Sequence, residues 1–281
     1  MKLSIVLSLQ PAQFQAATFK GALQTNLARI AALGYDGVEL AIRDPKLVDL
    51  DNLELLIRKQ GLAVPAIGTG QAWGEEGLSF TDPDPGIRRA AIERIISHIP
   101  VAVRFQAIII IGLIRGVVKP GVDPAQAIAW QVDALRECCA AASQSGIRLA
   151  LEPINRNETN LINTIAEGLE LIGRVAEYGI RAPRKTEAPA RDARGVPRID
   201  SPKLVEPGGN FGLLLDTYHM NIEETDILKS IQSCGSHIFH FHVADSNRMH
   251  PGGGELEFKA ILSGNCGMAF LLLDYYISSS I

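Results

Sequence analysis

The chain has 281 residues, enough for one large domain or two small ones with a substantial buried core. Hydrophobic residues make up 47% and charged residues 21%, which is typical of a globular protein rather than a disordered or membrane-spanning one. The net charge of −4 provides no global basic field for nucleic acid or anionic lipid, and no apolar run reaches the roughly 20 residues that span a bilayer. We therefore expect a cytoplasmic protein with no nucleic-acid partner and no membrane partner.

Short β-rich runs alternate with longer amphipathic stretches from the N-terminus onward. The runs that indicate strands cover residues 2–8, 37–42, 63–70, 107–113, 147–154, 211–217, 238–245 and 269–276. The stretches that indicate helices cover residues 23–34, 50–61, 85–99, 125–146, 164–179 and 224–235. Near-continuous apolar runs such as 107–113 are typical of parallel strands buried on both faces. The pattern predicts an α/β protein with a (β/α)8 TIM-barrel fold, in preference to a doubly wound open sheet.

Two regions depart from this alternation. Residues 181–209 are rich in Pro, Arg and Gly without periodicity, which indicates a surface insertion in a single barrel domain of residues 1–281 rather than a nucleic-acid arm. From Phe258 onward only Lys259 and Asp274 are charged, and the chain ends soon afterwards. We expect a truncated or altered tail that lacks the final helix of the barrel. The uncovered last strand would favour a homo-oligomer.

Acidic and histidine residues stand at the expected carboxyl ends of the last four strands: Glu152, Asp216, His242 and Asp274. In a TIM barrel these strand ends form the active-site face. Each residue alone is more typical of a helix cap or a core position, but four on consecutive strands indicate one shared site. Three carboxylates beside one imidazole are oxygen-rich ligands that suit Mn²⁺, Mg²⁺ or Co²⁺, and Zn²⁺ also accepts them.

The loops after the first three of these residues each offer a second polar group. Glu158, His219 and Arg248 follow them by six, three and six positions. This spacing predicts that all three reach a bound substrate. The alternatives are surface solvation for Glu158, helix capping for His219 and a structural salt bridge for Arg248.

Three motifs at these strand ends carry a resemblance to a known family. They are "EPINRNE" (152–158), "DTYHMNIEE" (216–224) and "HFHVADSNRMHPG" (240–252), joined by a similar stretch at 66–95. Together they resemble the xylose isomerase-like sugar isomerases and epimerases, and within these the group of D-tagatose 3-epimerase and D-psicose 3-epimerase. The likeness covers about residues 1–180 and 208–260.

The resemblance implies a carbohydrate isomerase that epimerises C3 of a free ketose through a cis-enediolate, with a divalent metal, Mn²⁺ first, as cofactor. Glu152, Asp216 and His242 match three of the family's metal ligands. Three further residues match the positions that contact the substrate: Glu158, His219 and Arg248. The family uses two metal-bound glutamates on opposite faces of the sugar as bases, and Glu152 matches one of them.

The fourth ligand is where this chain departs from the family. The last strand of the family carries a Glu, but residues 264–281 contain none. Counting directly from Gly264 places the position of the fourth ligand at Leu272. The strand pattern offers Asp274 instead, two residues later. We assign Asp274 as the fourth ligand and second catalytic base. Because Asp is one methylene shorter than Glu, we expect impaired activity, reduced to weak binding or to single-base aldose–ketose isomerisation.

Three other functions compete with this prediction. A phosphosugar isomerase or epimerase could use backbone N–H groups of "HPGGGE" (250–255), although no Lys/Arg cluster accompanies them. A catalytically degenerate barrel that only binds sugar would account for the unusual tail. A DNA-repair nuclease of the endonuclease IV type would need a cluster of metals, which six histidines and an acidic net charge argue against.

Overall fold

Parallel strands form a closed ring at the centre of the computed structural model, which describes residues 2–11, 19–181, 209–263 and 270–273. The ring contains β1 (Lys2–Ser8), β3 (Gly37–Ala41), β4 (Ala66–Gly68), β5 (Ile108–Ile111), β6 (Leu149–Leu151), β7 (Phe211–Asp216), β8 (Ile238–Val243) and β9 (Phe270–Leu273). The strand β9 pairs with both β8 and β1, which closes the barrel. A short β2 (Phe19–Lys20) pairs with the carboxyl end of β1. The predicted α/β TIM barrel is confirmed.

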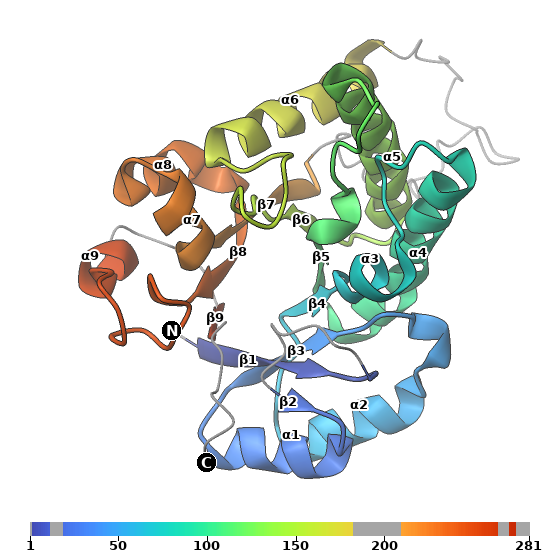
Figure 1. Ribbon diagram of the computed structural model, residues 1–281. Coiled ribbons are helices and arrows are strands. Elements are labelled where there is room, and N and C mark those ends of the chain that lie inside the picture. Colours follow the sequence, from blue (N-terminus) through green and yellow to red (C-terminus); the bar gives the residue numbers. More distant parts are fainter. Residues whose placement is uncertain (1, 12–18, 182–208, 264–269, 274–281) are drawn as a thin grey trace, which may run out of the picture.

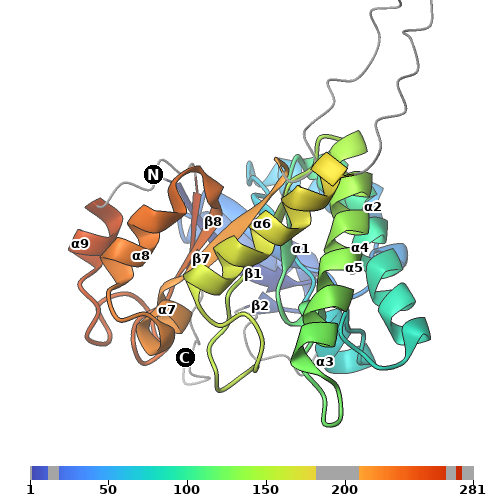
Figure 2. The same ribbon diagram turned by 90° about the horizontal axis from the view of Figure 1, so that it is seen from above.

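Helices surround the ring (Figure 1). They are α1 (Leu23–Ala32), α2 (Leu50–Lys59), α3 (Gln71–Glu76), α4 (Pro85–Phe105), α5 (Pro124–Gln144), α6 (Ile165–Arg181), α7 (Thr217–Glu223), α8 (Ile227–Cys234) and α9 (Phe258–Ser263). The long α4 and α5 lie side by side, and α6 packs against α5 (Figure 2). Both α4 and α5 begin at an Asp–Pro pair, in which the aspartate accepts a hydrogen bond from a backbone N–H of the first turn. The helix α4 continues through Pro100, past the predicted end at residue 99.

The interior of the barrel is divided into apolar and polar parts. Alternate side chains of each strand point inward. One inward apolar cluster contains Ala66, Ile108, Ile110, Ala150 and Leu214, and a second contains Val6, Ala41 and Leu272. Buried polar side chains from β3, β7 and β8 share this interior: Glu39, Asp216, His240 and His242. Since all strands run in the same direction, the carboxyl ends that carry the predicted ligands lie on one face of the barrel.

Parts of two predictions lie outside the described residues. The proposed insertion at 181–209 falls there except for its two end positions, and so does the chain after residue 273. The insertion, the single-domain boundary of 1–281 and the absence of a final helix therefore stay predictions. Among the helices that the structure describes, none has the length and apolarity needed to cross a membrane.

Candidate metal and sugar site

Three predicted ligands meet where β6, β7 and β8 end. Glu152 comes directly after β6, Asp216 is the last residue of β7, and His242 is paired with Asp216 across the β7–β8 ladder. The Nδ1 atom of His242 lies 3.8 Å from Oδ2 of Asp216 and 4.0 Å from Oε1 of Glu152. The three side chains therefore surround one point, as adjacent strand ends in a parallel barrel require.

The two carboxylate oxygens of Asp216 have different surroundings. Oδ1 caps α7, because it accepts hydrogen bonds from the backbone N–H of Tyr218 at 2.7 Å and of His219 at 3.3 Å. Oδ2 is buried and has no hydrogen-bond donor among the residues that the structure describes. Burial alone would raise the pKa of Asp216, but the neighbouring His219, His242 and Arg248 lower it below its usual range.

A buried, ionised oxygen without a donor is costly unless a cation neutralises it. The donor set of two carboxylates and one imidazole is of the type that divalent metals take. The ligand atoms of Glu152, Asp216 and His219 also lie within 4.8 Å of one another, so a second histidine competes for the role of ligand. These residues fit a divalent ion, and the question is which histidine would bind it.

The hydrogen bonds of Asn155 assign the proton of His219. The side-chain oxygen of Asn155 accepts from the backbone N–H of Asn157 at 2.9 Å, so its amide nitrogen must face Nδ1 of His219, 2.7 Å away. Burial lowers the pKa of His219, so the ring is neutral and carries its one proton on Nε2. That N–H lies 3.6 Å from Oε1 of Glu152. His219 therefore presents a donor to the site, which fits the predicted substrate contact better than a metal ligand.

Glu158 and Arg248 form an ion pair at 2.7 Å beside this cluster. The guanidinium of Arg248 also lies over the ring of Tyr218, with its carbon 4.8 Å from the ring centroid. Both charged residues line the same cavity as Glu152, His219 and His242. Five of the predicted residues thus line one cavity, and the sixth, Asp216, lies beside it with its Oδ2 3.8 Å from Nδ1 of His242. Their roles as ligands and contacts stay predictions.

Asp245 holds the loop that carries Arg248. Arg248 has a left-handed backbone with φ of 59°, and its N–H donates to the carbonyl oxygen of Asp245 at 2.8 Å. The Asp245 carboxylate accepts from the backbone N–H of Gly252 at 2.8 Å and of Leu256 at 3.0 Å. Burial would raise the pKa of Asp245, but these and other backbone hydrogen bonds, from Leu256 first, hold it below the usual range.

Sequence reasoning missed Arg115, which lies fully buried in the short 3₁₀ helix η2 (Leu113–Arg115). Its guanidinium donates to the carbonyl oxygen of Glu152, and to those of Leu161 and Ile162 at 3.0 Å. Burial lowers the pKa of Arg115 to about 10, so the side chain keeps its charge at neutral pH. Arg115 therefore anchors both ends of the loop that follows β6. The only signal in the sequence is a lone charge inside an apolar run.

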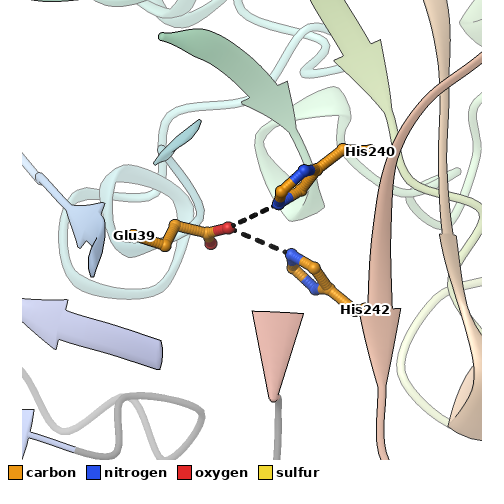
Figure 3. Close-up of side chains that lie close together, drawn as sticks. All are labelled: Glu39, His240 and His242. Atoms are coloured by element: carbon orange, nitrogen blue, oxygen red, sulfur yellow. Dashed lines mark hydrogen bonds and ion pairs between the residues drawn. The ribbon is translucent and has the colours of Figure 1, made fainter. Parts of the chain in front are cut away.

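Glu39 is the second residue that sequence reasoning missed. It lies on β3, and its Oε2 is within 3.1 Å of ring nitrogens of both His240 and His242 (Figure 3). A charged side chain at an inward position of the otherwise apolar segment "GVELAI" is the signal that could have found it.

The expected fourth ligand, Asp274, lies outside the described residues. On β9, the residue that pairs with His242 is Leu272, which is buried beside Val6 and Ala41. The position across from the histidine is therefore apolar. The assignment of Asp274 as ligand and second base stays a prediction.

The closed (β/α)8 barrel with carboxylates and histidines at its strand ends defines the class of protein. The family described as xylose isomerase-like TIM barrel matches residues 27–181, more than half of the chain. The chain belongs to this family, and the resemblance expected from the three motifs is confirmed.

Two relatives of known activity align with most of the chain. The ketose 3-epimerase of Arthrobacter globiformis is 28% identical over 228 residues, which cover 80% of this chain and 66% of the relative. The L-ribulose 3-epimerase of Methylomonas sp. strain DH-1 is 28% identical over 240 residues, which cover 84% and 71%. The aligned part thus spans just under two thirds of the Arthrobacter protein.

A solved structure of D-psicose 3-epimerase with D-tagatose from Clostridium cellulolyticum H10 superposes with a TM-score of 0.73. The alignment has 22% identity and covers 99% of this chain and 86% of that one. At this identity the likeness supports the fold. It agrees with the closed barrel described above.

Proposed function

We propose that the chain is a divalent-metal-dependent carbohydrate epimerase that inverts C3 of a free ketose. The observation that carries this proposal is the buried carboxylate of Asp216, whose Oδ2 faces Nδ1 of His242 and has no hydrogen-bond donor within the described part of the chain. The names of the aligned relatives, ketose 3-epimerase and L-ribulose 3-epimerase, support the same reaction class.

Glu152, Asp216 and His242 would hold the ion. Their oxygen-rich donor set makes Mn²⁺ the first choice, and Mg²⁺, Co²⁺ and Zn²⁺ are compatible with the same ligands. When bound, the ion supplies Lewis acidity that makes the proton beside a ketose carbonyl easier to remove.

The protein's own groups divide the remaining work. Glu152 accepts the proton from C3. Gly112 leaves room for the Glu152 carboxylate, because a Cβ at residue 112 would lie only 3.3 Å from its Oε2. His219 donates its Nε2 proton to a sugar oxygen. The paired Arg248 and Glu158 bind hydroxyl groups as donor and acceptor and fix the register of the sugar.

The second proton transfer is assigned to Asp274 as a proposal. Leu272 favours a second candidate function, because β9 presents an apolar side chain where it pairs with His242. With Glu152 as the only base near the ion, the barrel would bind ketoses weakly or exchange protons between C1 and C2 as an aldose–ketose isomerase.

A phosphosugar substrate is disfavoured by the loop at 250–255. Three of its backbone N–H groups are already used, because Gly252 donates to Asp245, Gly253 to the His250 carbonyl, and Glu255 to the Ser246 hydroxyl. An anion at this loop would have to displace these bonds.

The test uses protein stripped of metal with a chelator and then supplied with Mn²⁺. D-Psicose, D-tagatose and L-ribulose are incubated in deuterated water, and NMR follows exchange at C1 and C3. We expect exchange at C3 that needs the ion and vanishes in Asp216→Asn. Glu170→Gln, on the exposed face of α6, is the matched control and should keep full exchange.

Two results would contradict the proposal in different ways. Exchange confined to C1 would replace the epimerase with the isomerase. An ion that binds with about one equivalent per chain but supports no exchange in any of the three sugars would leave a sugar-binding barrel. The proposed cytoplasmic location and homo-oligomeric state are tested separately, by fractionation of the source cells and by light scattering.

A further inference from the structure

Glu39, His240 and His242 form a buried triad inside the barrel (Figure 3). Glu39 reaches inward from β3, and the two histidines stand on the same face of β8, two residues apart. The Nε2 atoms of His240 and His242 lie 3.0 and 3.1 Å from the same oxygen, Oε2 of Glu39. One carboxylate oxygen therefore joins two imidazole rings.

The charge of Glu39 fixes the direction of these hydrogen bonds. Both Nε2 atoms lie within 3.1 Å of one carboxylate oxygen, and a carboxylate can only accept, so each ring must donate from Nε2. An imidazole whose one proton is on Nε2 has its lone pair on Nδ1.

The opposite side of the His242 ring faces the candidate metal ligands. Nδ1 of His242 lies 3.8 Å from Oδ2 of Asp216 and 4.0 Å from Oε1 of Glu152. We propose that Glu39 is a positioning residue that fixes the Nε2 proton of His242 and thereby presents Nδ1 to the divalent ion. This inference deepens the proposed function, because it needs an ion at Glu152, Asp216 and His242.

The triad also distinguishes the two histidines of the site. Asn155 leaves His219 with a proton on the nitrogen that faces Glu152, whereas Glu39 leaves His242 with a lone pair on the nitrogen that faces Asp216. One ring is thus prepared to donate to a sugar oxygen and the other to bind a cation. A carboxylate that holds the far nitrogen of a metal-binding histidine also raises the basicity of the ligand.

The same three side chains could instead bind an ion themselves, since their ligand atoms lie within 4.8 Å of one another. The geometry favours the hydrogen-bonded arrangement. Both ring nitrogens are directed at the oxygen atom of Glu39 itself, at ordinary hydrogen-bond lengths. The number of ions bound per chain distinguishes the two arrangements.

The experiment combines a measurement without metal and one with it. In the metal-free protein, ¹⁵N NMR of the histidine rings should show His240 and His242 with the proton on Nε2. Glu39→Gln keeps the size of the side chain but offers a neutral amide, which can donate as well as accept. We expect mixed tautomers of His242 in this variant. We also expect Mn²⁺, titrated by calorimetry, to bind about 10- to 100-fold more weakly.

His98→Gln is the matched control for the loss of a buried polar contact. His98 is fully buried in α4, and its ring nitrogens contact the carbonyl oxygens of Arg94 at 2.7 Å and Ile42 at 3.0 Å. Its substitution should lower the midpoint of thermal unfolding without changing the affinity for Mn²⁺. If Glu39→Gln does not fold, His240→Gln removes one arm of the triad. In that variant Glu39 still orients His242, so we expect a loss of Mn²⁺ affinity of only a few-fold.

Several results would overturn the positioning role. A wild-type His242 with its proton on Nδ1 is one, and Mn²⁺ affinity unchanged in Glu39→Gln is another. Two ions per wild-type chain, reduced to one in Glu39→Gln, would show that the triad is itself a metal site. A wild-type protein that binds no ion overturns the proposed function and the positioning role with it, so the two failures are distinguishable.

Discussion

Where β7 meets β8, the inward side chains are Asp216 and His242, whereas β9 and β1 present Leu272 and Val6. Both sides are buried and both belong to the same ring of parallel strands. The difference shows that the barrel places its candidate ligands on consecutive strands and uses the next strands of the ring, β9 and β1, for packing. A cation bound at Asp216 would therefore find protein oxygens on one side and an apolar wall on the other.

The two sides also differ in what stabilises them. Burial of the Leu272 side chain contributes about 2 kcal/mol through the hydrophobic effect and needs no partner. Burial of Asp216, Glu39 and the histidines is costly unless each polar atom is satisfied. Most of these atoms have hydrogen bonds from neighbouring loops and strands, but Oδ2 of Asp216 has none among the described residues. The polar side is thus incomplete without an ion.

The largest expected effect follows from Asp216→Asn. Asparagine retains the oxygen that caps α7 and replaces the buried Oδ2 by an uncharged amide. We expect Mn²⁺ affinity to fall by more than about 100-fold, since even outer partners of metal ligands are worth 10- to 100-fold. Calorimetric titration measures this change.

The stability of the metal-free protein provides the control for Asp216→Asn. Since His219, His242 and Arg248 stabilise the charge of Asp216, its removal should lower the free energy of unfolding of the metal-free protein modestly. Urea unfolding in the presence of a chelator measures this. A variant that loses stability without metal and keeps its affinity for Mn²⁺ would show that Asp216 is a structural cap only.

Arg115→Met should destabilise the polar side of the barrel, because Arg115 anchors the loop that follows β6. The carbonyl oxygens of Glu152, Leu161 and Ile162 would each lose a hydrogen bond in a buried region. That of Ile162 keeps a second donor, the backbone N–H of Ile154 at 3.3 Å. We expect the free energy of unfolding to fall by about 2 kcal/mol, because each unsatisfied buried acceptor costs about 1 kcal/mol or more. Urea unfolding followed by circular dichroism measures the change.

Arg174→Met is the matched control for Arg115. Arg174 lies half-exposed on α6 and pairs with Glu170 at 2.6 Å. Because exposed pairs contribute little, we expect a change below about 0.5 kcal/mol. Equal losses in the two variants would mean that the buried hydrogen bonds of Arg115 have no special value.

The candidate ligands could be found from the sequence because their positions follow from local rules. Alternation of side chains and the ends of apolar runs placed Glu152, Asp216 and His242 on one face of the barrel. The same rules extended β4 to residues 63–70, whereas the strand covers only Ala66–Gly68. Strand ends are set by pairing with neighbours, which a single run of residues does not reveal.

Glu39 and Arg115 could not be assigned by such rules. Glu39 contacts His240 across 201 positions of sequence, and Arg115 contacts the carbonyl of Glu152 across 37. Pairing of β9 with β8 likewise decides that Leu272, rather than a carboxylate, stands beside His242. These contacts depend on how the strands are arranged around the ring, which a single run of residues does not reveal.

Leu272→Glu tests whether the apolar side limits the site. A glutamate at this position would place a fourth carboxylate on the strand that neighbours His242. We expect Mn²⁺ to bind about 10-fold more tightly, equivalent to about 1.4 kcal/mol, and C3 exchange of ketoses to increase. The metal-free variant should be less stable than the wild type, because it buries a charge in place of a leucine.

Leu272→Gln separates charge from size at this position. Glutamine has nearly the same volume as glutamate but adds no negative charge, so it should lower stability without tightening the binding of Mn²⁺. Calorimetric titration of both variants gives the comparison. Equal affinities for the two would show that residue 272 does not reach the ion.

The smallest expected effect concerns acid stability and Asp245, which lies in the loop of Arg248. The pKa of Asp245 in the folded protein lies below its usual value, because backbone hydrogen bonds to the carboxylate outweigh the effect of burial. Its contribution to stability is therefore present above the unfolded pKa of about 3.9 and is lost as the pH falls through the folded pKa. In Asp245→Asn we expect a loss of about 1 kcal/mol at pH 7 and a smaller loss below pH 4.

Urea unfolding at pH 7 and pH 3.5 measures this difference for Asp245→Asn and for Asp133→Asn. Asp133 is exposed on α5 and pairs with Arg136, three residues away, at 3.3 Å. Its substitution should change stability little at either pH. If the loss in Asp245→Asn were the same at both pH values, the carboxylate charge would not hold the loop. The φ of 59° at Arg248 would then be maintained by its backbone bond to the carbonyl of Asp245 alone.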